Sequence, residues 1–425
     1  MSGDTIFALS SGSPPAAIAV VRISGPRAFA AVEDLAGRLP PPRRAGLRIL
    51  RDGEGGVLDT ALVLTFPGPN SATGENCAEL HLHGGRAVVA AVESALASRE
   101  LRRAEAGEFT RRAFANGRMD LTEAEGLADL LSAETELQRR NAQALAGGAL
   151  AQAVEQWRTA LLTLAAEIEA DLDFSDDDDV SALAADFGTR CAALASDLAD
   201  WLDAPRAETL KEGFRVVLAG PPNAGKSSLF NALLGEDAAI ATPIAGTTRD
   251  ILTRPVAIRG IPFLFSDTAG LREGTDDAIE RIGIDRARTE LNKADLVLWL
   301  GEEGQGPAGA WEIETMIDLP SHAAKSSPHR RVSAVDGTGL SALLDDMVDL
   351  ARTAMPRPGQ VALSAHQGGL LALARDGLIQ AGVERDPLLA AEQLRVARMA
   401  FDRLTGRAAT EDMLDTLFGR FCIGK

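Results

Sequence analysis

Two long stretches of the chain carry apolar residues at the three- and four-residue spacing of a helix that buries one face. One stretch covers residues 119–213 and the other residues 360–418, and both are rich in Ala and Leu. The spacing is clearest at Leu121, Ala124, Leu127, Leu130 and Leu131, and again at Leu161, Leu164, Ile168 and Leu172. Such segments are typical of helical bundles. We therefore expect one discontinuous helical domain, residues 119–213 and 357–425.

The segment between these stretches has a different pattern, in which short apolar runs alternate with polar loops. The runs FRVVLA, IPFLFS and LVLWL, which begin at residues 214, 261 and 296, have the composition of buried strands. SLFNALLG, from residue 228, favours a helix. Because the segment lies between the two parts of the helical domain, residues 214–356 are predicted to form an inserted α/β domain.

The first 118 residues differ from both regions. DTIFAL, AAIAVVRISG and ALVLTFPGP are short strand-like runs bounded by Gly and Pro, and GRAVVAAVESALAS has helical spacing. This mixture predicts an α+β domain over residues 1–118. The expected fold class is therefore a multidomain α/β and α protein.

The composition of the chain indicates a soluble protein from a reducing compartment. The 425 residues are 46% hydrophobic, with no run long enough to span a bilayer and no signal peptide at the start, so we expect a cytoplasmic protein without a membrane partner. Three cysteines, Cys77, Cys191 and Cys422, are too few and too scattered for a disulfide scaffold or a four-ligand zinc site. Cys77 and Cys191 have the apolar neighbours of core residues.

Charge is distributed unevenly along the chain. The net charge is −18 at pH 7, and most of the excess acid lies in residues 119–213. An acidic total argues against indiscriminate nucleic-acid binding. A short span near the end of the first domain is nevertheless basic, and its side chains could meet phosphates or simply face solvent on a helix: Arg99, Arg102, Arg103, Arg111, Arg112 and Arg118.

Residues 220–228, GPPNAGKSS, fit the phosphate-binding pattern G-x-x-x-x-G-K-[ST] between a predicted strand and a predicted helix. Glycines let backbone N–H groups close around phosphate oxygens, Lys226 reaches the β and γ phosphates, and the Ser227 hydroxyl can ligate Mg²⁺. A Gly-rich turn without function is the alternative. The predicted contacts are Asn223, Ala224, Gly225, Lys226, Ser227 and Ser228.

Two further elements of a G protein follow in order. TPIAGTTRD, residues 242–250, offers Thr248 as a second hydroxyl ligand for Mg²⁺. DTAG, residues 267–270, puts Asp267 at a strand's carboxyl end, where a Walker-B-type aspartate would hold Mg²⁺. The contacts predicted from these loops are Thr242, Pro243, Ile244, Ala245, Gly246, Thr247 and Thr248, and Asp267, Thr268, Ala269 and Gly270.

The guanine-reading element departs from the usual N-K-x-D. That pattern occurs at residues 292–295, but there it ends a helical run and precedes the strand LVLWL, so we interpret it as a decoy. After the next strand only Thr315-Met316-Ile317-Asp318 is available, which keeps the aspartate and loses Asn and Lys. Asp318 either accepts hydrogen bonds from the N1 and N2 positions of guanine or is an acidic residue of an ordinary turn. Ser333 and Ala334 fit the fifth G-protein element, and few residues remain for a helix after Leu300.

The group that orients the attacking water must also differ from that of Ras-like proteins. The position directly after D-x-x-G is Leu271, which cannot hydrogen-bond water, so an acid in LREGTDDAIERIG is the expected substitute. The 242–248 loop has no arginine. A monovalent cation could supply the missing charge, with Asn223 as a ligand.

Several segments together resemble the MnmE (TrmE) family of tRNA-modification GTPases over nearly the whole chain. They include VVRISG, FPGPNSATGE, ELHLHGG, AGEFTRRAFANGRMDLTEAEGLADLL, IAGTTRD, DTAGLRE, ERIGIDRA and the terminal FCIGK. The resemblance implies an N-terminal domain that binds folate and forms a homodimer, a central helical domain and an inserted Ras-like G domain of the TrmE-Era-EngA type. It also implies potassium-dependent pairing of G domains. With the flavoprotein MnmG, such proteins add an aminomethyl or carboxymethylaminomethyl group to C5 of the wobble uridine of tRNA.

The resemblance also assigns roles to individual residues. Folate contacts, to a 5-formyl- or 5,10-methylene-tetrahydrofolate, fall on Arg22, Glu79, Arg118 and Lys425. Potassium ligands fall on Asn223, Thr242, Ile244 and Thr247, the water-positioning acid on Glu280, and a thiol near the one-carbon unit on Cys422. Two alternatives stay open: a ribosome-assembly or signalling GTPase of the Era or EngA type, and a generic ATP-using P-loop enzyme.

Overall fold

The computed structural model describes residues 3–173, 184–205, 207–236, 238–240, 253–267, 290–357 and 360–425. The chain divides into two compact units, residues 1–128 with 402–425 and residues 129–401. This division is coarser than the four segments expected from the sequence, whose boundaries remain a prediction. None of the helices in the described part of the chain combines the length and the apolarity needed to cross a bilayer.

The first unit contains a six-stranded sheet with strand order β3-β4-β5-β2-β1-β6. Its pairs are antiparallel apart from the short parallel pair of β1 and β6. The strands are β1 (Ile6–Leu9), β2 (Ile18–Ser24), β3 (Gly46–Arg51), β4 (Val57–Phe66), β5 (Cys77–His83) and β6 (Arg102–Arg103). The predicted strand-like runs and the α+β class are confirmed.

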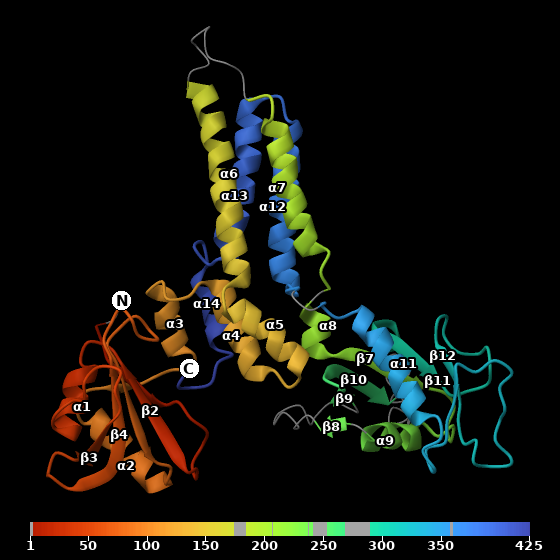
Figure 1. The fold of residues 1–425 in the computed structure, drawn as a ribbon, viewed down its shortest axis with the longest axis horizontal. Coiled ribbons are helices and arrows are strands. Elements are labelled where there is room, and N and C mark those ends of the chain that lie inside the picture. Colours follow the sequence, from red (N-terminus) through yellow and green to blue (C-terminus); the bar gives the residue numbers. More distant parts are fainter. Residues whose placement is uncertain are drawn as a thin grey trace, which may run out of the picture. The chain divides into compact units, whose positions relative to one another are not determined.

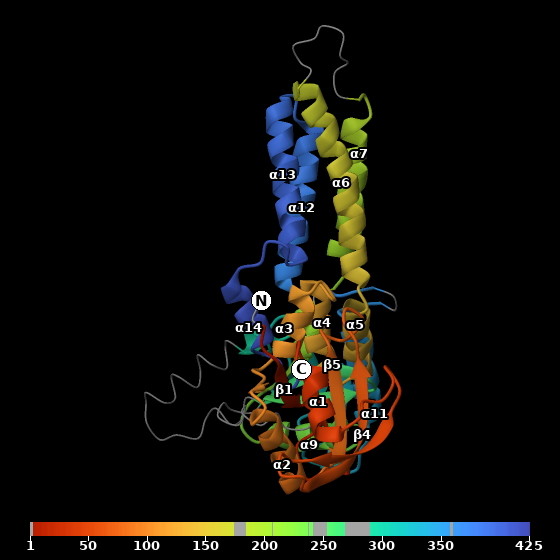
Figure 2. The same cartoon turned by 90° about the vertical axis from the view of Figure 1, so that its left-hand side faces the viewer.

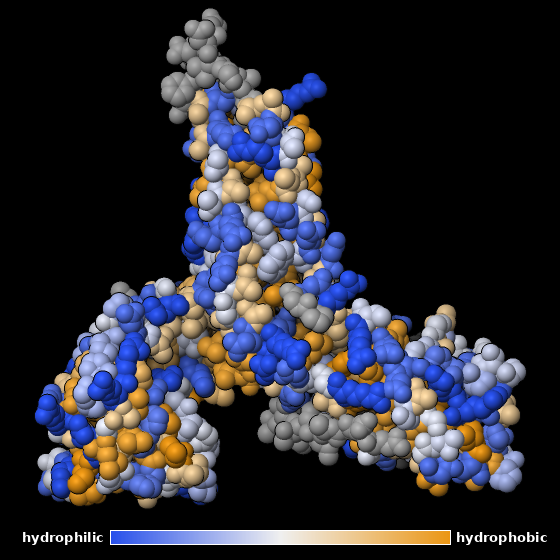
Figure 3. All heavy atoms as spheres, viewed as in Figure 1, coloured by the Kyte–Doolittle hydropathy of each residue, from blue (hydrophilic) through white to orange (hydrophobic). Residues whose placement is uncertain are grey.

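Strand alternation gives this sheet one covered and one open face. Helices α1 (Ala28–Ala36) and α2 (Arg86–Ala97) pack on the face that carries Val21, Val63 and Leu80, all fully buried. The opposite face carries apolar side chains that stay exposed, namely Ile18, Leu47, Ile49 and Leu62. Figure 3 shows hydrophobic surface over the part of this unit where Figure 1 labels β3, β4 and α2.

Short helices complete the first unit. They are α3 (Glu108–Ala115), the start of α4 (Leu121–Ser132) and α14 (Glu411–Phe418). Leu121 and Ala124 of α4 pack with Leu417 and Phe418 of α14 in a small core. Residues far apart in the sequence thus share one core.

The second unit contains a seven-stranded sheet with strand order β13-β12-β11-β7-β10-β9-β8. Its strands are β7 (Phe214–Ala219), β8 (Ala238–Ile240), β9 (Thr253–Ile258), β10 (Ile261–Asp267), β11 (Leu296–Trp299), β12 (Trp311–Glu314) and β13 (Arg330–Arg331). Strands β10, β7, β11 and β12 are parallel neighbours. Because the chain places β10 on one side of β7 and β11 on the other, β7 lies at the topological switch point, where such sheets bind ligands.

Helices α9 (Lys226–Glu236), α11 (Leu340–Thr353), α8 (Ala207–Glu212) and α5 (Glu136–Ala146) lie near this sheet. The predicted strands and the helix after the phosphate loop are confirmed. The connection from β11 to β12 contains no helix, as its short length predicted.

Four helices form the bundle that the apolar spacing predicted, and they lie side by side in Figures 1 and 2: α6 (Ala149–Asp173), α7 (Phe187–Leu202), α12 (Ala365–Val383) and α13 (Pro387–Leu404). Trp157 of α6 packs against Trp201 and Phe401, at 5.6 and 6.1 Å between ring centroids. The α/β domain is inserted between α7 and α12. The two connecting segments meet where the Ala207 N–H donates to the Leu363 carbonyl, at 2.9 Å.

Candidate functional site

The phosphate loop connects the carboxyl end of β7 to the first turn of α9. Gly225 has a φ of +85°, and a Cβ there would lie 3.1 Å from the Met316 Cε, so glycine meets both a backbone and a packing requirement. Asn223 also lies in the left-handed region, with a φ of +63°. These two positions give the loop the bend that a cradle for phosphate oxygens at a helix N-terminus requires.

Lys226 begins α9 and is 6% exposed. Its Nζ donates to the Gly220 carbonyl at 2.9 Å and to the Pro221 carbonyl at 2.7 Å, so the ammonium lies inside the curve of the loop. Ser227 and Ser228 follow on the helix and are exposed. The predicted residues thus follow one another from the end of β7 into the first turn of α9: Asn223, Ala224, Gly225, Lys226, Ser227 and Ser228.

Asp267 reaches the same edge of the sheet. Its backbone pairs in register with Leu218 of β7, one residue before the end of that strand. The other residues predicted around the γ phosphate lie outside the described residues, namely Thr242, Pro243, Ile244, Ala245, Gly246, Thr247, Thr248, Thr268, Ala269, Gly270 and Glu280.

The N-K-x-D pattern at 292–295 lies at the wrong end of the sheet to read a base, as predicted. The Asp295 Oδ2 accepts from the Arg215 N–H at 2.8 Å, and the Asp295 N–H donates to the Arg215 carbonyl at 2.9 Å. Arg215 is the second residue of β7, whereas the phosphate loop follows its last residue. Asp295 therefore holds the first residues of β7 in place through two hydrogen bonds to the Arg215 backbone.

The predicted guanine-reading residues lie together beyond the carboxyl ends of the neighbouring strands β12 and β13. The buried Ser333 hydroxyl donates to the Asp318 Oδ1 at 2.8 Å, and the half-buried Ala334 follows it. Sequence reasoning missed one connection: the Thr315 Oγ1 donates to the Ala224 carbonyl at 2.9 Å. The sequence showed Thr315 only as a departure from Asn.

Two of the predicted folate contacts form an ion pair in the first unit. The Arg22 guanidinium on β2 lies 2.9 Å from the Glu79 Oε1 on β5, on the open face of the sheet. The Glu79 Oε2 lies 3.2 Å from the His81 Nε2, and the Arg22 guanidinium lies 5.9 Å from the centroid of the Phe109 ring. Since both side chains are partly exposed, the pair presents a cation and a carboxylate to a ligand.

The terminal FCIGK run docks onto the same unit rather than fraying. Gly424 has a φ of +97° and its carbonyl accepts from the Ser10 hydroxyl at 2.8 Å, while a Cβ there would lie 2.1 Å from the Leu9 carbonyl oxygen. The Lys425 carbonyl accepts from the Phe109 N–H at 3.2 Å. Phe109 therefore contacts both Arg22 and the terminal residue.

Cys422 and Arg118 are the remaining predicted residues of this region. The Cys422 residue is exposed, so it is not a core residue of this unit. Cys77 and Cys191 are buried, as predicted, and burial raises the pKa of the Cys191 thiol to about 11. Arg118 is exposed and follows α3, where its side chain borders Gly74.

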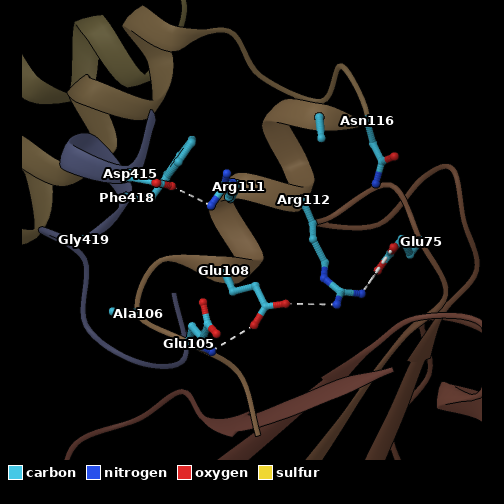
Figure 4. Close-up of a pocket in the computed structure, with 11 residues that line it drawn as sticks. Glu75, Glu105, Ala106, Glu108, Arg111, Arg112, Asn116, Asp415, Phe418 and Gly419 are labelled. Atoms are coloured by element: carbon cyan, nitrogen blue, oxygen red, sulfur yellow. Dashed lines mark hydrogen bonds and ion pairs between the residues drawn. The ribbon is translucent and has the colours of Figure 1, made fainter. Parts of the chain in front are cut away.

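A cavity of about 670 Å³ lies beside α3 and α14 (Figure 4). Among the residues that line it, the Arg111 guanidinium lies 2.8 Å from the Asp415 carboxylate, and the Arg112 guanidinium lies 3.0 Å from Glu108 and 3.2 Å from Glu75. Burial alone raises the pKa of Glu108, but hydrogen bonds from Arg102, Arg112 and the Glu105 backbone outweigh it and lower that pKa.

These ion pairs change the interpretation of the basic span. Arg102 pairs with Asp4 and Glu108, and Arg103 pairs with Glu93. Arg102, Arg103, Arg111 and Arg112 therefore each pair with a carboxylate of the same unit, and the side chains of the first three stay exposed to solvent. Contact of this span with phosphates stays a prediction.

Comparison with known proteins covers both units. Residues 5–118 match the family of the GTP-binding protein TrmE N-terminus, and residues 121–422 match the MnmE helical domain. The chain is 62% identical to the tRNA modification GTPase MnmE of Erythrobacter litoralis over 99% of this chain and 100% of that protein. It is 60% identical to the protein of the same name from Novosphingobium aromaticivorans, over 99% and 100% of the two chains.

Among solved structures, the cytosolic domain of the T. maritima FeoB iron transporter in a GDP form aligns with 45% of this chain and 97% of its own, at 18% identity and a TM-score of 0.23. The family models span the α+β domain and the bundle, and the relatives match nearly the full length of the chain. The chain therefore belongs to the MnmE family of tRNA modification GTPases.

Proposed function

We propose that this chain hydrolyses GTP while modifying tRNA, and that with the flavoprotein MnmG it adds an aminomethyl or carboxymethylaminomethyl group to C5 of the wobble uridine. The observation that carries the GTPase part is the phosphate loop at the switch point of the sheet, with Asp318 and Ser333 beyond the ends of β12 and β13 in the same sheet. Family membership supports the tRNA part.

The proposed Mg²⁺ and K⁺ sites use different residues of the nucleotide site. Ser227 and Thr248 would hold Mg²⁺, with Asp267 beside them, and the metal would neutralise charge on the β and γ phosphates. K⁺ would lie at Asn223, Thr242, Ile244 and Thr247. The Asn223 side chain fits a cation ligand because it is exposed on the loop and, within the described residues, its amide has no hydrogen-bond partner. Glu280 would position the attacking water.

A tetrahydrofolate derivative, 5-formyl or 5,10-methylene, is the proposed one-carbon donor. Glu79 can accept hydrogen bonds from the polar pterin edge, and Arg22, Arg118 and Lys425 can meet its carboxylates or carbonyl groups. The residues present fit such a ligand, since the Arg22 and Glu79 side chains are 25% and 18% exposed and lie on an open sheet face. Cys422 is the thiol proposed to approach the one-carbon unit, which the bound folate supplies.

The open sheet face also supports the proposal of a homodimer. Ile18, Leu47, Ile49 and Leu62 are between 44% and 63% exposed on the same face as Arg22. An apolar face of this kind fits a second copy of the chain. We propose a cytoplasmic homodimer that assembles with MnmG and binds tRNA.

The test of the proposed function is mass spectrometry of tRNA nucleosides from a strain that lacks this chain. We expect the modified wobble uridine to disappear and to return with a plasmid copy. Unchanged uridine modification would exclude this function and favour a ribosome-assembly or signalling GTPase. Competition binding then separates the ATP-using alternative, because ATP should not displace a labelled guanine nucleotide as GTP does.

A further inference from the structure

The segment that follows β12 is tied directly to the phosphate loop. The Thr315 Oγ1 donates to the Ala224 carbonyl at 2.9 Å, and both residues are half-buried. The two residues are 91 positions apart in the sequence. One side-chain hydrogen bond therefore joins the loop that binds phosphate to the segment proposed to read the base.

Met316 brings the same segment into contact with the phosphate loop. Its φ of +57° lies in the left-handed region, which a bulky side chain seldom adopts. A Cβ on Gly225 would lie 3.1 Å from the Met316 Cε, so the methionine packs against this glycine. The Leu319 N–H then donates to the Met316 carbonyl at 2.9 Å, which turns the chain directly before and through Asp318.

One carboxylate oxygen of Asp318 is hydrogen-bonded within the protein, and the other can bind a ligand. Its Oδ1 accepts from the Ser333 hydroxyl at 2.8 Å, and the Ser333 Oγ in turn accepts from the Val335 N–H at 3.2 Å. The carboxylate is exposed, and within the part of the chain that is described the Oδ2 has no hydrogen-bond partner. A carboxylate oxygen in this state can accept from the N–H groups on one edge of a purine.

We propose that the Thr315 hydroxyl is the positioning group that couples guanine recognition at Asp318 to the phosphate loop, in place of the missing Asn and Lys. The inference rests on the proposed GTPase function. The tether fixes the separation between the carboxylate that reads the base and the N–H groups that hold the phosphates. Because the two loops are ordered before binding, a guanine nucleotide that contacts both gains affinity.

This coupling makes a prediction about selectivity. GDP contacts both loops, whereas ADP has no N–H groups at the base positions that Asp318 would read and depends on the phosphate loop. Loss of the tether should therefore weaken GDP binding more than ADP binding. A general loss of stability would weaken both nucleotides together.

The experiment measures the dissociation constants of GDP and ADP for the full-length chain by isothermal titration calorimetry. Thr315→Val keeps the shape of the side chain and removes the donor, whereas Thr315→Ser keeps the hydroxyl. We expect Thr315→Val to weaken GDP binding roughly tenfold, since the Ala224 carbonyl also loses its partner, and to change ADP binding less than about twofold. Thr315→Ser should remain close to wild type.

A double-mutant cycle with Asp318→Ala provides the second readout. If the hydroxyl acts through Asp318, Thr315→Val should add almost nothing to the loss of GDP affinity in the Asp318→Ala background. Additive losses, equal losses for GDP and ADP, or an unchanged GDP affinity in Thr315→Val would each overturn the tether. The wild-type ratio of GDP to ADP affinity reports separately on the proposed function, because a ratio near one would remove guanine recognition itself.

Discussion

The two candidate ligand sites of this chain are built from different parts of the polypeptide. The nucleotide site is made largely of consecutive backbone in the loop between β7 and α9, with Lys226 as its main side chain. The proposed folate site is made of side chains on neighbouring strands and of the docked terminal run, with residues such as Arg22 and Lys425. A site formed by one loop leaves a motif in the sequence, whereas a site assembled across a sheet leaves isolated residues.

Replacing the terminal thiol tests the folate site with the largest expected effect. Cys422→Ser should abolish wobble-uridine modification if the thiol works on the one-carbon unit, since a hydroxyl is a much weaker nucleophile. The fold and GTP hydrolysis should be unchanged, because the Cys422 side chain is exposed. Nucleoside mass spectrometry of complemented strains is the measurement, and full modification by the serine variant would rule out the thiol's role.

Removal of the proposed water-positioning acid tests the nucleotide site. Glu280→Ala should lower kcat for GTP hydrolysis by roughly 10²-fold and leave nucleotide binding nearly intact. Asp277→Ala, in the same acidic stretch, is the matched control and should retain most activity. Single-turnover hydrolysis with separately measured GDP affinity gives both quantities, and a Glu280→Ala rate within twofold of wild type would exclude the assignment.

The ion pair on the open sheet face should control folate affinity. Arg22→Ala removes a charged hydrogen-bond donor, and Glu79 loses its ion-pair partner. The dissociation constant for 5-formyltetrahydrofolate should therefore rise by roughly tenfold to a hundredfold. Lys425→Ala, which keeps the backbone contact with Phe109, should have a smaller effect. Arg27→Ala is the control, since Arg27 pairs with Glu100 at an exposed position. Equal affinities for all three variants would place the folate elsewhere.

Measuring GTP turnover in different salts tests whether a bound K⁺ supplies the positive charge that an arginine would otherwise supply at the nucleotide site. Replacing KCl with NaCl at equal ionic strength should reduce the rate by roughly tenfold, because transition-state charge near the phosphate loop would lose its stabilising cation. Asn223→Ala should remove most of the difference between the two salts. Equal wild-type rates in both salts would contradict the potassium proposal.

The acid stability of the first unit should show the smallest effect. The pKa of Glu108 is lowered from 4.5, so its contribution to stability is present above that value and is lost as pH falls through the lower folded-state pKa. Glu108→Gln should lower the melting temperature by about 2 °C at pH 7, and the difference from wild type should shrink below pH 4.5. A difference that is constant with pH would show that the charge of Glu108 does not contribute.

The sequence predicted the parts of the molecule that local patterns control. The bundle helices, the strands of both sheets and the phosphate loop follow from apolar spacing and from Gly and Lys at fixed positions. The pattern also identified residues 292–295 as a decoy, because a helical run precedes a strand there. These predictions depend on neighbours in the chain, which the sequence contains.

Contacts between distant segments were not predictable in this way. Thr315 could have been any polar turn residue, and its bond to Ala224 follows from the placement of β12 beside β11. Likewise, Arg102, Arg111 and Arg112 gave no sign of their distant acidic partners, because Asp4, Glu75 and Asp415 come from the two ends and the middle of the unit. Arg22 and Glu79 were singled out by family resemblance alone.

The bond between Ser10 and Gly424 joins positions 414 residues apart, and this has a consequence for the order of events during synthesis. The sheet strands β1 to β5 leave the ribosome long before residues 402–425 exist. These strands must therefore pair, or stay unpaired, before the terminal residues Gly424 and Lys425 contact Leu9 and Phe109. Because closing a loop costs less when the intervening chain is already compact, the nascent protein should finish its second unit before it completes its first.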